Sequence, residues 1–198
     1  LEKYATWRDL IDNDGDGSID EEPFDGIDND HDGIIDEDTQ GYPTTPDVMF
    51  KLNAGSLKQI AQNNGTYFAS QTEYENYRAA HGGSLPGGEI LYLDFDLWQP
   101  ANLSQTMNAT PSIIIQHNAA GSALMKNVHY QFKGLILGDF VQHINGDFML
   151  VGAFMSFGNK AIGNAFGNGN ALIRFSSQVL GQLPSGSLGQ NVRIVAFQ

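Results

Sequence analysis

A gap-free repeat of 18 residues in the C-terminal half limits the choice of folds more than any other feature. The run FKGLIL at 132–137 aligns with LVGAFM at 150–155, and this run aligns with NGNALI at 168–173. Short apolar segments separated by Gly and Asn turns at such a period predict the rungs of a β-solenoid, in which each rung packs against the next. The aligned sets are Gly134, Gly152 and Asn170; Leu135, Ala153 and Ala171; Ile136, Phe154 and Leu172; Leu137, Met155 and Ile173; Ile144 and Ile162; and Phe148 and Phe166.

The remaining pattern after residue 41 predicts short helices followed by strands. Helices are expected over about 55–62 and about 71–80, the second opened by the capping-box sequence SQTE. Strands are expected within 89–98, where apolar residues alternate, and at 113–116, a β-branched run. The expected fold is therefore mainly β with a few short helices. A β-solenoid is favoured, and a β-sandwich of short antiparallel strands is the alternative.

Residues 9–40 contain a second, tandem repeat, DLIDNDGDGSIDEEPF followed by DGIDNDHDGIIDEDTQ, with an offset of 16 residues. Carboxylates on alternate residues, followed by Gly and a further Asp, supply the oxygen ligands and the sharp turn that Ca²⁺ requires. Both copies match the EF-hand loop through position 9, but position 12 is Pro23 in one and Thr39 in the other, so the bidentate Glu is missing. Magnesium fits less well, because it keeps its waters and seldom takes an all-protein cage.

The tandem repeat therefore predicts a site for two or more calcium ions. The alternative is an acidic segment that stays disordered, as unpatterned charge runs do. Candidates for the missing position are the acids at the loop margins, Asp9, Glu21, Glu22, Asp25, Glu37 and Asp38. The predicted ligands are Asp12, Asp14, Asp16, Ser18, Asp20, Glu22, Asp25, Asp28, Asp30, Asp32, Ile34, Asp36 and Asp38.

The net charge of −13 belongs entirely to this acidic segment. Residues 1–40 contain 15 of the 23 acids and 2 of the 10 bases, so residues 41–198 are neutral overall. Without cations these carboxylates repel one another, and we expect calcium binding and folding of the segment to be coupled. Nucleic acid is a poor partner for such a surface. The expected organisation is an acidic repeat at 1–40, a linker at 41–54, and a helical lead-in with the β-repeat domain at 55–198.

The composition indicates an extracellular or cell-surface protein. Cysteine is absent, so calcium and not disulfides would supply the cross-links. Loops with imperfect ligands suit the millimolar calcium found outside cells. No run of about 18 apolar residues predicts a membrane span. The chain begins at Leu1, which predicts that an N-terminal portion has been removed.

Parts of the chain resemble known families. The acidic loops resemble thrombospondin type 3 repeats, and DGIDNDHDGIIDED is similar to the D-G-x-D-N-D-C-D-G-x-x-D-E motif of many secreted bacterial proteins, with His31 at the cysteine position. The runs SLKQIAQNNGTYF, FKGLILGDFVQHINGDFMLVGAFMSFG and NGNALIRFSSQVLGQLP, within 55–185, resemble the C-terminal domain of bacterial PilX-type pilus-assembly proteins. This resemblance implies export and a cell-surface or extracellular role, and it carries over no catalytic residues. The pilin-like hydrophobic helix with which such proteins begin is not in this sequence.

No motif in the sequence reaches the standard of a catalytic site, and we expect no enzyme. A carbohydrate-active solenoid using Asp94, Asp96 or Asp139 is the residual alternative. The favoured hypothesis is a secreted calcium-binding structural subunit of an extracellular, pilus-like fibre, with copies of the chain as partners in a helical polymer and other pilus-like or cell-surface components as further candidates. The second hypothesis is a monomeric, calcium-stabilised pilus-tip or surface adhesin.

Overall fold

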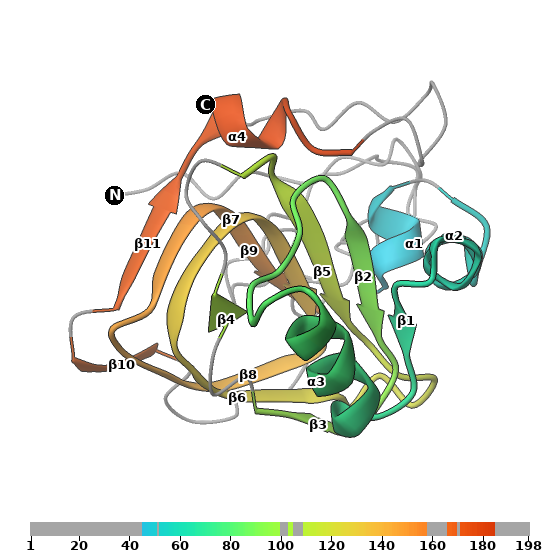
Figure 1. Cartoon of the computed structure of the whole chain (residues 1–198), viewed down its shortest axis with the longest axis horizontal. Helices are drawn as coiled ribbons and strands as arrows, with labels where there is room; N and C mark the ends of the chain where they lie inside the picture. Colours follow the sequence, from blue (N-terminus) through green and yellow to red (C-terminus); the bar gives the residue numbers. More distant parts are fainter. Residues whose placement is uncertain are drawn as a thin grey trace, which may run out of the picture. The chain divides into compact units, whose positions relative to one another are not determined.

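The strands of the larger sheet follow one another along the chain and lie side by side in the same order (Figure 1). The computed structural model describes residues 45–50, 52–99, 103–104, 109–157, 166–169 and 171–184. The larger sheet contains β1 (Tyr67–Phe68), β2 (Ile90–Leu93), β5 (Ser112–Gln116), β7 (Tyr130–Gly138), β9 (Met149–Ser156) and β11 (Leu172–Phe175), with β4 (Leu103–Ser104) beside β7. The smaller sheet contains β3 (Leu97–Trp98), β6 (Leu124–Val128), β8 (Phe140–Gly146) and β10 (Phe166–Gly169).

Each turn of the chain contributes one strand to each sheet. The order β1-β2-β5-β7-β9-β11 in the larger sheet is matched by β3-β6-β8-β10 in the smaller one, and the described strand pairs are parallel. This winding is a parallel β-solenoid of about four turns. It confirms the expected solenoid and differs from the antiparallel sandwich that was the alternative.

The 18-residue offset is confirmed between β7 and β9, where Gly134 pairs with Gly152 and Ile136 with Phe154. The predicted alignment of the third copy, at 168–173, is wrong. Leu172, expected beside Phe154, pairs with Met149.

The predicted strand partners of the neighbouring residues are wrong for the same reason. Phe175 lies beside Gly152, so Ala171 and Ile173 are also out of the expected register, and Phe166 pairs with Ile144 instead of Phe148. The other two residues of the alignment, Ile162 and Asn170, lie outside the described residues. Parallel pairing fixes which strands meet but not the length of the turns between them, which can vary at little cost.

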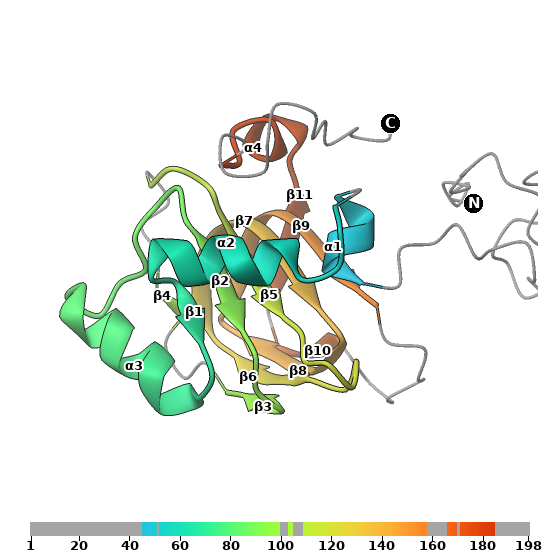
Figure 2. The same cartoon turned by 90° about the vertical axis from the view of Figure 1, so that its right-hand side faces the viewer.

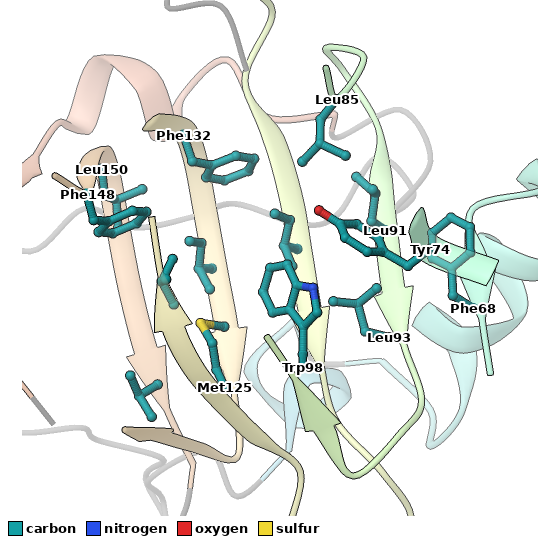
Figure 3. Close-up of a cluster of buried hydrophobic side chains, with 14 residues drawn as sticks. Phe68, Tyr74, Leu85, Leu91, Leu93, Trp98, Met125, Phe132, Phe148 and Leu150 are labelled. Atoms are coloured by element: carbon teal, nitrogen blue, oxygen red, sulfur yellow. The ribbon is translucent and has the colours of Figure 1, made fainter. Parts of the chain in front are cut away.

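Alternation along the strands sends side chains to two apolar clusters, one on each face of the larger sheet. In β2, Leu91 and Leu93 face the smaller sheet, whereas Ile90 and Tyr92 face outward. A parallel sheet covered on both faces requires near-continuous apolar strands, and every residue of β2 and β5 is buried. The inner cluster (Figure 3) consists of Phe68, Tyr74, Leu85, Leu91, Leu93, Trp98, Ile114, Met125, Val128, Phe132, Ile136, Val141, Phe148 and Leu150.

The outer face is covered by helices, because α2 (Ser56–Asn64) lies across the strands (Figure 2). Leu57 and Ala61 of α2 are fully buried there. Asp47, in α1 (Pro46–Met49), orients α2 by accepting hydrogen bonds from the backbone N–H groups of Gly55 and Leu57, each at 2.9 Å. Farther along the sheet, Leu180 of α4 (Ser177–Leu180) and Leu183 join the outer cluster. The described fold therefore includes residues before 55, within the range that the sequence assigned to a linker.

The predicted helix start is confirmed at α3 (Gln71–Ala80), with Ser70 as N-cap, but the return bond of the capping box goes to the residue before the N-cap. The Ser70 hydroxyl accepts from the Glu73 N–H at 3.3 Å, and the Glu73 carboxylate accepts from the Ala69 N–H at 2.7 Å. Tyr74 and Tyr77 of α3 pack on Phe68, with ring centroids 5.9 and 5.0 Å apart. Helix α3 therefore covers the inner cluster at the β1 end of the solenoid. In the described part of the chain, no helix is long and apolar enough to cross a membrane.

Candidate functional site

The predicted calcium ligands, from Asp12 to Asp38, all lie outside the described residues, so their geometry stays a prediction. Among the residues that the structure does describe, no three His, Asp or Glu side chains gather as a metal-binding group. The calcium hypothesis therefore depends on the acidic repeat alone.

The described polar residues gather instead at one corner of the solenoid, where β2, β5 and β7 end. Leu93, Gln116 and Gly138 occupy the same register position, so the next residues, Asp94, His117 and Asp139, occupy equivalent positions on successive turns. The backbone N–H of His117 donates to the Leu93 carbonyl at 3.2 Å, and that of Asp139 donates to the Gln116 carbonyl at 3.2 Å. We call Asp94, His117 and Asp139 the corner column.

Asp139 is the most buried member of the corner column, with 1% of its surface exposed. Its Oδ1 lies 2.6 Å from Nδ1 of His117 on the preceding turn. Its Oδ2 accepts from the N–H groups of Asn118 at 3.3 Å and Ala123 at 3.0 Å. A buried carboxylate needs hydrogen-bond partners of this kind. These bonds join the β5–β6 connection to the end of β7.

Asn118 extends this network toward the preceding turn. Its Nδ2 donates to Asp96 Oδ1 at 2.9 Å, and its Oδ1 accepts from the Ser122 N–H at 3.0 Å. Asn118 therefore binds both carboxylates, Asp96 through its side chain and Asp139 through its backbone N–H. The network links successive turns at the point where the chain passes from the larger sheet to the smaller one.

Asp94 belongs to a separate cluster at the β1 edge. Its Oδ2 accepts from Lys58 Nζ at 2.6 Å and from the Tyr67 hydroxyl at 2.9 Å, so it joins α2 to β1 and β2. The hydrogen bond to Asp94 raises the pKa of Lys58. Burial, together with the bond to Asp94, raises the pKa of the Tyr67 hydroxyl.

The corner column acts chemically as a set of inter-turn ties. Asp94, Asp96 and Asp139 were the candidate catalytic carboxylates, but each is bound by partners within the fold. Asp94 binds Lys58 and Tyr67, and Asp96 binds Asn118. Asp139 binds His117 and two backbone N–H groups. This arrangement supports a structural role for these three residues. The expectation that the chain is not an enzyme stays a prediction.

Sequence reasoning missed the His117–Asp139 pair, although one signal was present. The two residues are 22 positions apart, which is the offset between the paired strands β5 and β7. A polar residue directly after each of two apolar segments at that spacing places both side chains at one end of a parallel sheet. A second pair of this kind, His129 Nδ1 with Asp147 Oδ1 at 2.8 Å, lies in more exposed surroundings at another corner.

Comparisons of the chain with protein-family models, with curated proteins and with solved structures returned no match.

Proposed function

We propose that this chain is a secreted calcium-binding structural subunit of an extracellular, pilus-like homopolymeric fibre. The observation that carries the proposal is the tandem acidic repeat, whose Asp12–Asp20 and Asp28–Asp36 loops repeat one calcium-ligand pattern and account for the whole net charge. Neither loop has the Glu expected at position 12. An acid from a loop margin or from a neighbouring copy would fill each vacancy.

Calcium ions shared between copies would serve two purposes. They would join neighbouring chains, and they would cancel the repulsion between segments that each carry a charge of −13. One contact between unlike surfaces, repeated from copy to copy, builds an open helical polymer. The solenoid supports this proposal because its last described strand, β11, has four exposed residues. The resemblance of residues 55–185 to PilX-type proteins is in keeping with a cell-surface assembly.

A monomeric, calcium-stabilised adhesin is the second candidate, and the cap formed by α3 favours it. Tyr74 of α3 is 1% exposed and packs edge-on against Trp98 with ring centroids 5.6 Å apart. A polar-faced cap over a terminal repeat is what a solenoid requires in order to stay soluble as a monomer. In that case calcium would stiffen a spacer and would not join subunits.

Sedimentation velocity and calorimetric titration of the full chain separate these functions. We expect calcium to bind with a stoichiometry of two or more ions and to convert monomers into polymers, which EGTA reverses. The double variant Asp14→Asn with Asp30→Asn should lose both effects. The control, Glu2→Gln with Asp147→Asn, removes the same charge outside the loops and should keep them. Calcium binding without any change in sedimentation would favour the adhesin, and absence of binding would contradict both functions.

A further inference from the structure

Strand β11 forms one end of the larger sheet and is unusually apolar for an exposed strand. It pairs with β9 along one edge, and along its other edge the described residues provide no strand. Leu172 is 50% exposed, Ile173 is 37% exposed and Phe175 is 58% exposed. Natural sheets usually blunt or cover such an edge, because unpaired backbone groups beside apolar side chains attract another strand.

The interior of the solenoid also reaches the surface at β11. Leu150 of the inner cluster pairs with Ile173, so Ile173 continues an interior row to the last turn. Phe175 lies beside Gly152, which has no side chain to cover it. The β1 end differs, because Tyr74 and Tyr77 of α3 pack over its apolar residues. Among the described residues, the solenoid therefore has one end covered by a helix and one end with no further rung.

The spacing of the paired strands indicates which segment supplies that rung. Paired residues are 23 positions apart in β2 and β5, 22 in β5 and β7, 18 in β7 and β9, and 23 in β9 and β11. The same spacings, counted from β11, reach residues 190–198, where the sequence reads QNVRIVAFQ. Val192, Ile194 and Ala196 alternate there, so a strand would present one wholly apolar face. That face matches the open row at Ile173.

The path of the chain after β11 argues that this strand is offered to another copy. From β2 to β11, the connections between neighbouring strands pass through the smaller sheet and step in one direction, so they share one hand. After β11 the chain crosses to the opposite face, where Leu180 and Leu183 join the outer cluster (Figure 1). A connection from β11 to a further parallel strand along this outer face would have the opposite hand to the earlier connections. Crossover connections within one sheet almost always have the same hand.

We propose that the edge of β11 that no described strand covers accepts residues 191–197 of a second copy as an added strand. This inference rests on the proposed fibre and names its protein–protein joint: backbone hydrogen bonds supply affinity, and the apolar face of the donor covers Ile173 and Phe175. Each copy has one donor and one acceptor, so the joint repeats without closing. Calcium then bridges the acidic segments of copies that this strand joint holds side by side, so the polymer needs both contacts.

Two variants test the joint in the full chain with calcium present. Ile194→Lys disables the donor, and Phe175→Lys disables the acceptor at a side chain that is already exposed. Gln190→Lys is the control, since it adds the same charge at the margin of the segment. We expect Gln190→Lys to form fibres and each of the other variants to remain monomeric. An equimolar mixture of Ile194→Lys and Phe175→Lys should give dimers of one chain of each kind by mass photometry, because it contains a single working joint.

A labelled peptide of residues 190–198 tests the acceptor without relying on fibres. It should bind the Ile194→Lys chain saturably in fluorescence anisotropy, whereas the same peptide with Lys at position 194 should not bind. Fibres of normal length from both variants would overturn the inference and leave the calcium proposal standing. Monomers that form no mixed dimers would overturn it in favour of pairing within one chain. Peptide binding by a chain that never polymerises would support the acceptor edge while contradicting the fibre.

Discussion

Gly152 in β9 lies so close to Gly134 in β7 that a Cβ atom on Gly152 would overlap the Gly134 carbonyl oxygen. Gly134 approaches the carbonyl of Ser112 in β5 in the same way. Both glycines have positive φ, 142° at Gly152 and 145° at Gly134, which L-amino acids with side chains rarely adopt. Three successive turns of the solenoid therefore depend on close backbone contact in this column.

Gly152→Ala should destabilise the solenoid by about 3 kcal/mol, because it combines an unfavourable φ with overlap against backbone that cannot move aside. Urea unfolding followed by circular dichroism measures the change. Gly138→Ala is the control, since the nearest atoms to its Cβ would lie at ordinary contact distances of 3.8 and 3.9 Å. Equal stabilities of the two variants would contradict the close-approach explanation.

Asp139→Asn should lower the free energy of unfolding by about 2–3 kcal/mol. The substitution keeps the shape of the side chain but removes a buried charge that faces His117 and two backbone N–H groups. Asp147→Asn changes the equivalent pair with His129, where the Asp147 side chain is 59% exposed, and should cost less than about 1 kcal/mol. If the two variants unfold at the same urea concentration, Asp139 does not hold the turns together.

Tyr74→Phe should stabilise the protein by about 1 kcal/mol. The Tyr74 hydroxyl is buried and has no hydrogen-bond partner among the described residues, so its removal relieves a desolvation cost while the ring contacts remain. Tyr67→Phe should have the opposite effect, because it breaks the bond to Asp94. A loss of stability in Tyr74→Phe would indicate that the hydroxyl has a partner, such as bound water.

Stability should fall as the pH rises above about 10, the ordinary pKa of a tyrosine hydroxyl. Burial raises the pKa of Tyr74 and Tyr92, and the bond to Asp94 raises that of Lys58. The folded chain therefore holds these protons more tightly than the unfolded chain, so the stabilisation is complete below the unfolded pKa values and is lost above them. Urea midpoints measured between about pH 8 and about pH 11 should decline, and Tyr92→Phe should reduce the decline. Urea midpoints that do not change over this pH range would contradict the raised pKa values.

The solenoid was predictable because β7 and β9 are separated by a turn that preserves an 18-residue offset along the whole pairing. The β9–β11 register was not, because that offset is 23 residues and Gly152 pairs with Phe175, which carries no turn signature. Paired strands can be joined by turns of different length, so a search for a single period detects only β7 and β9, whose offset matches that period.

The corner column was harder to predict than the strands. His117 and Asp139 become neighbours only once the β5–β7 register is known, and an isolated His or Asp after an apolar run has many ordinary explanations. The reverse holds for the predicted calcium ligands. Their spacing is evident in the sequence, whereas residues 1–44 lie outside the part of the chain that the structure describes.

Electron microscopy of the full chain in about 1 mM calcium, before and after an excess of EGTA, tests the proposed calcium-bridged fibre most directly. We expect filaments of uniform helical symmetry with calcium, single subunits after chelation, and filaments again when calcium is restored. Filaments that keep their length in EGTA would contradict the proposal, and so would a chain that remains monomeric at every calcium concentration.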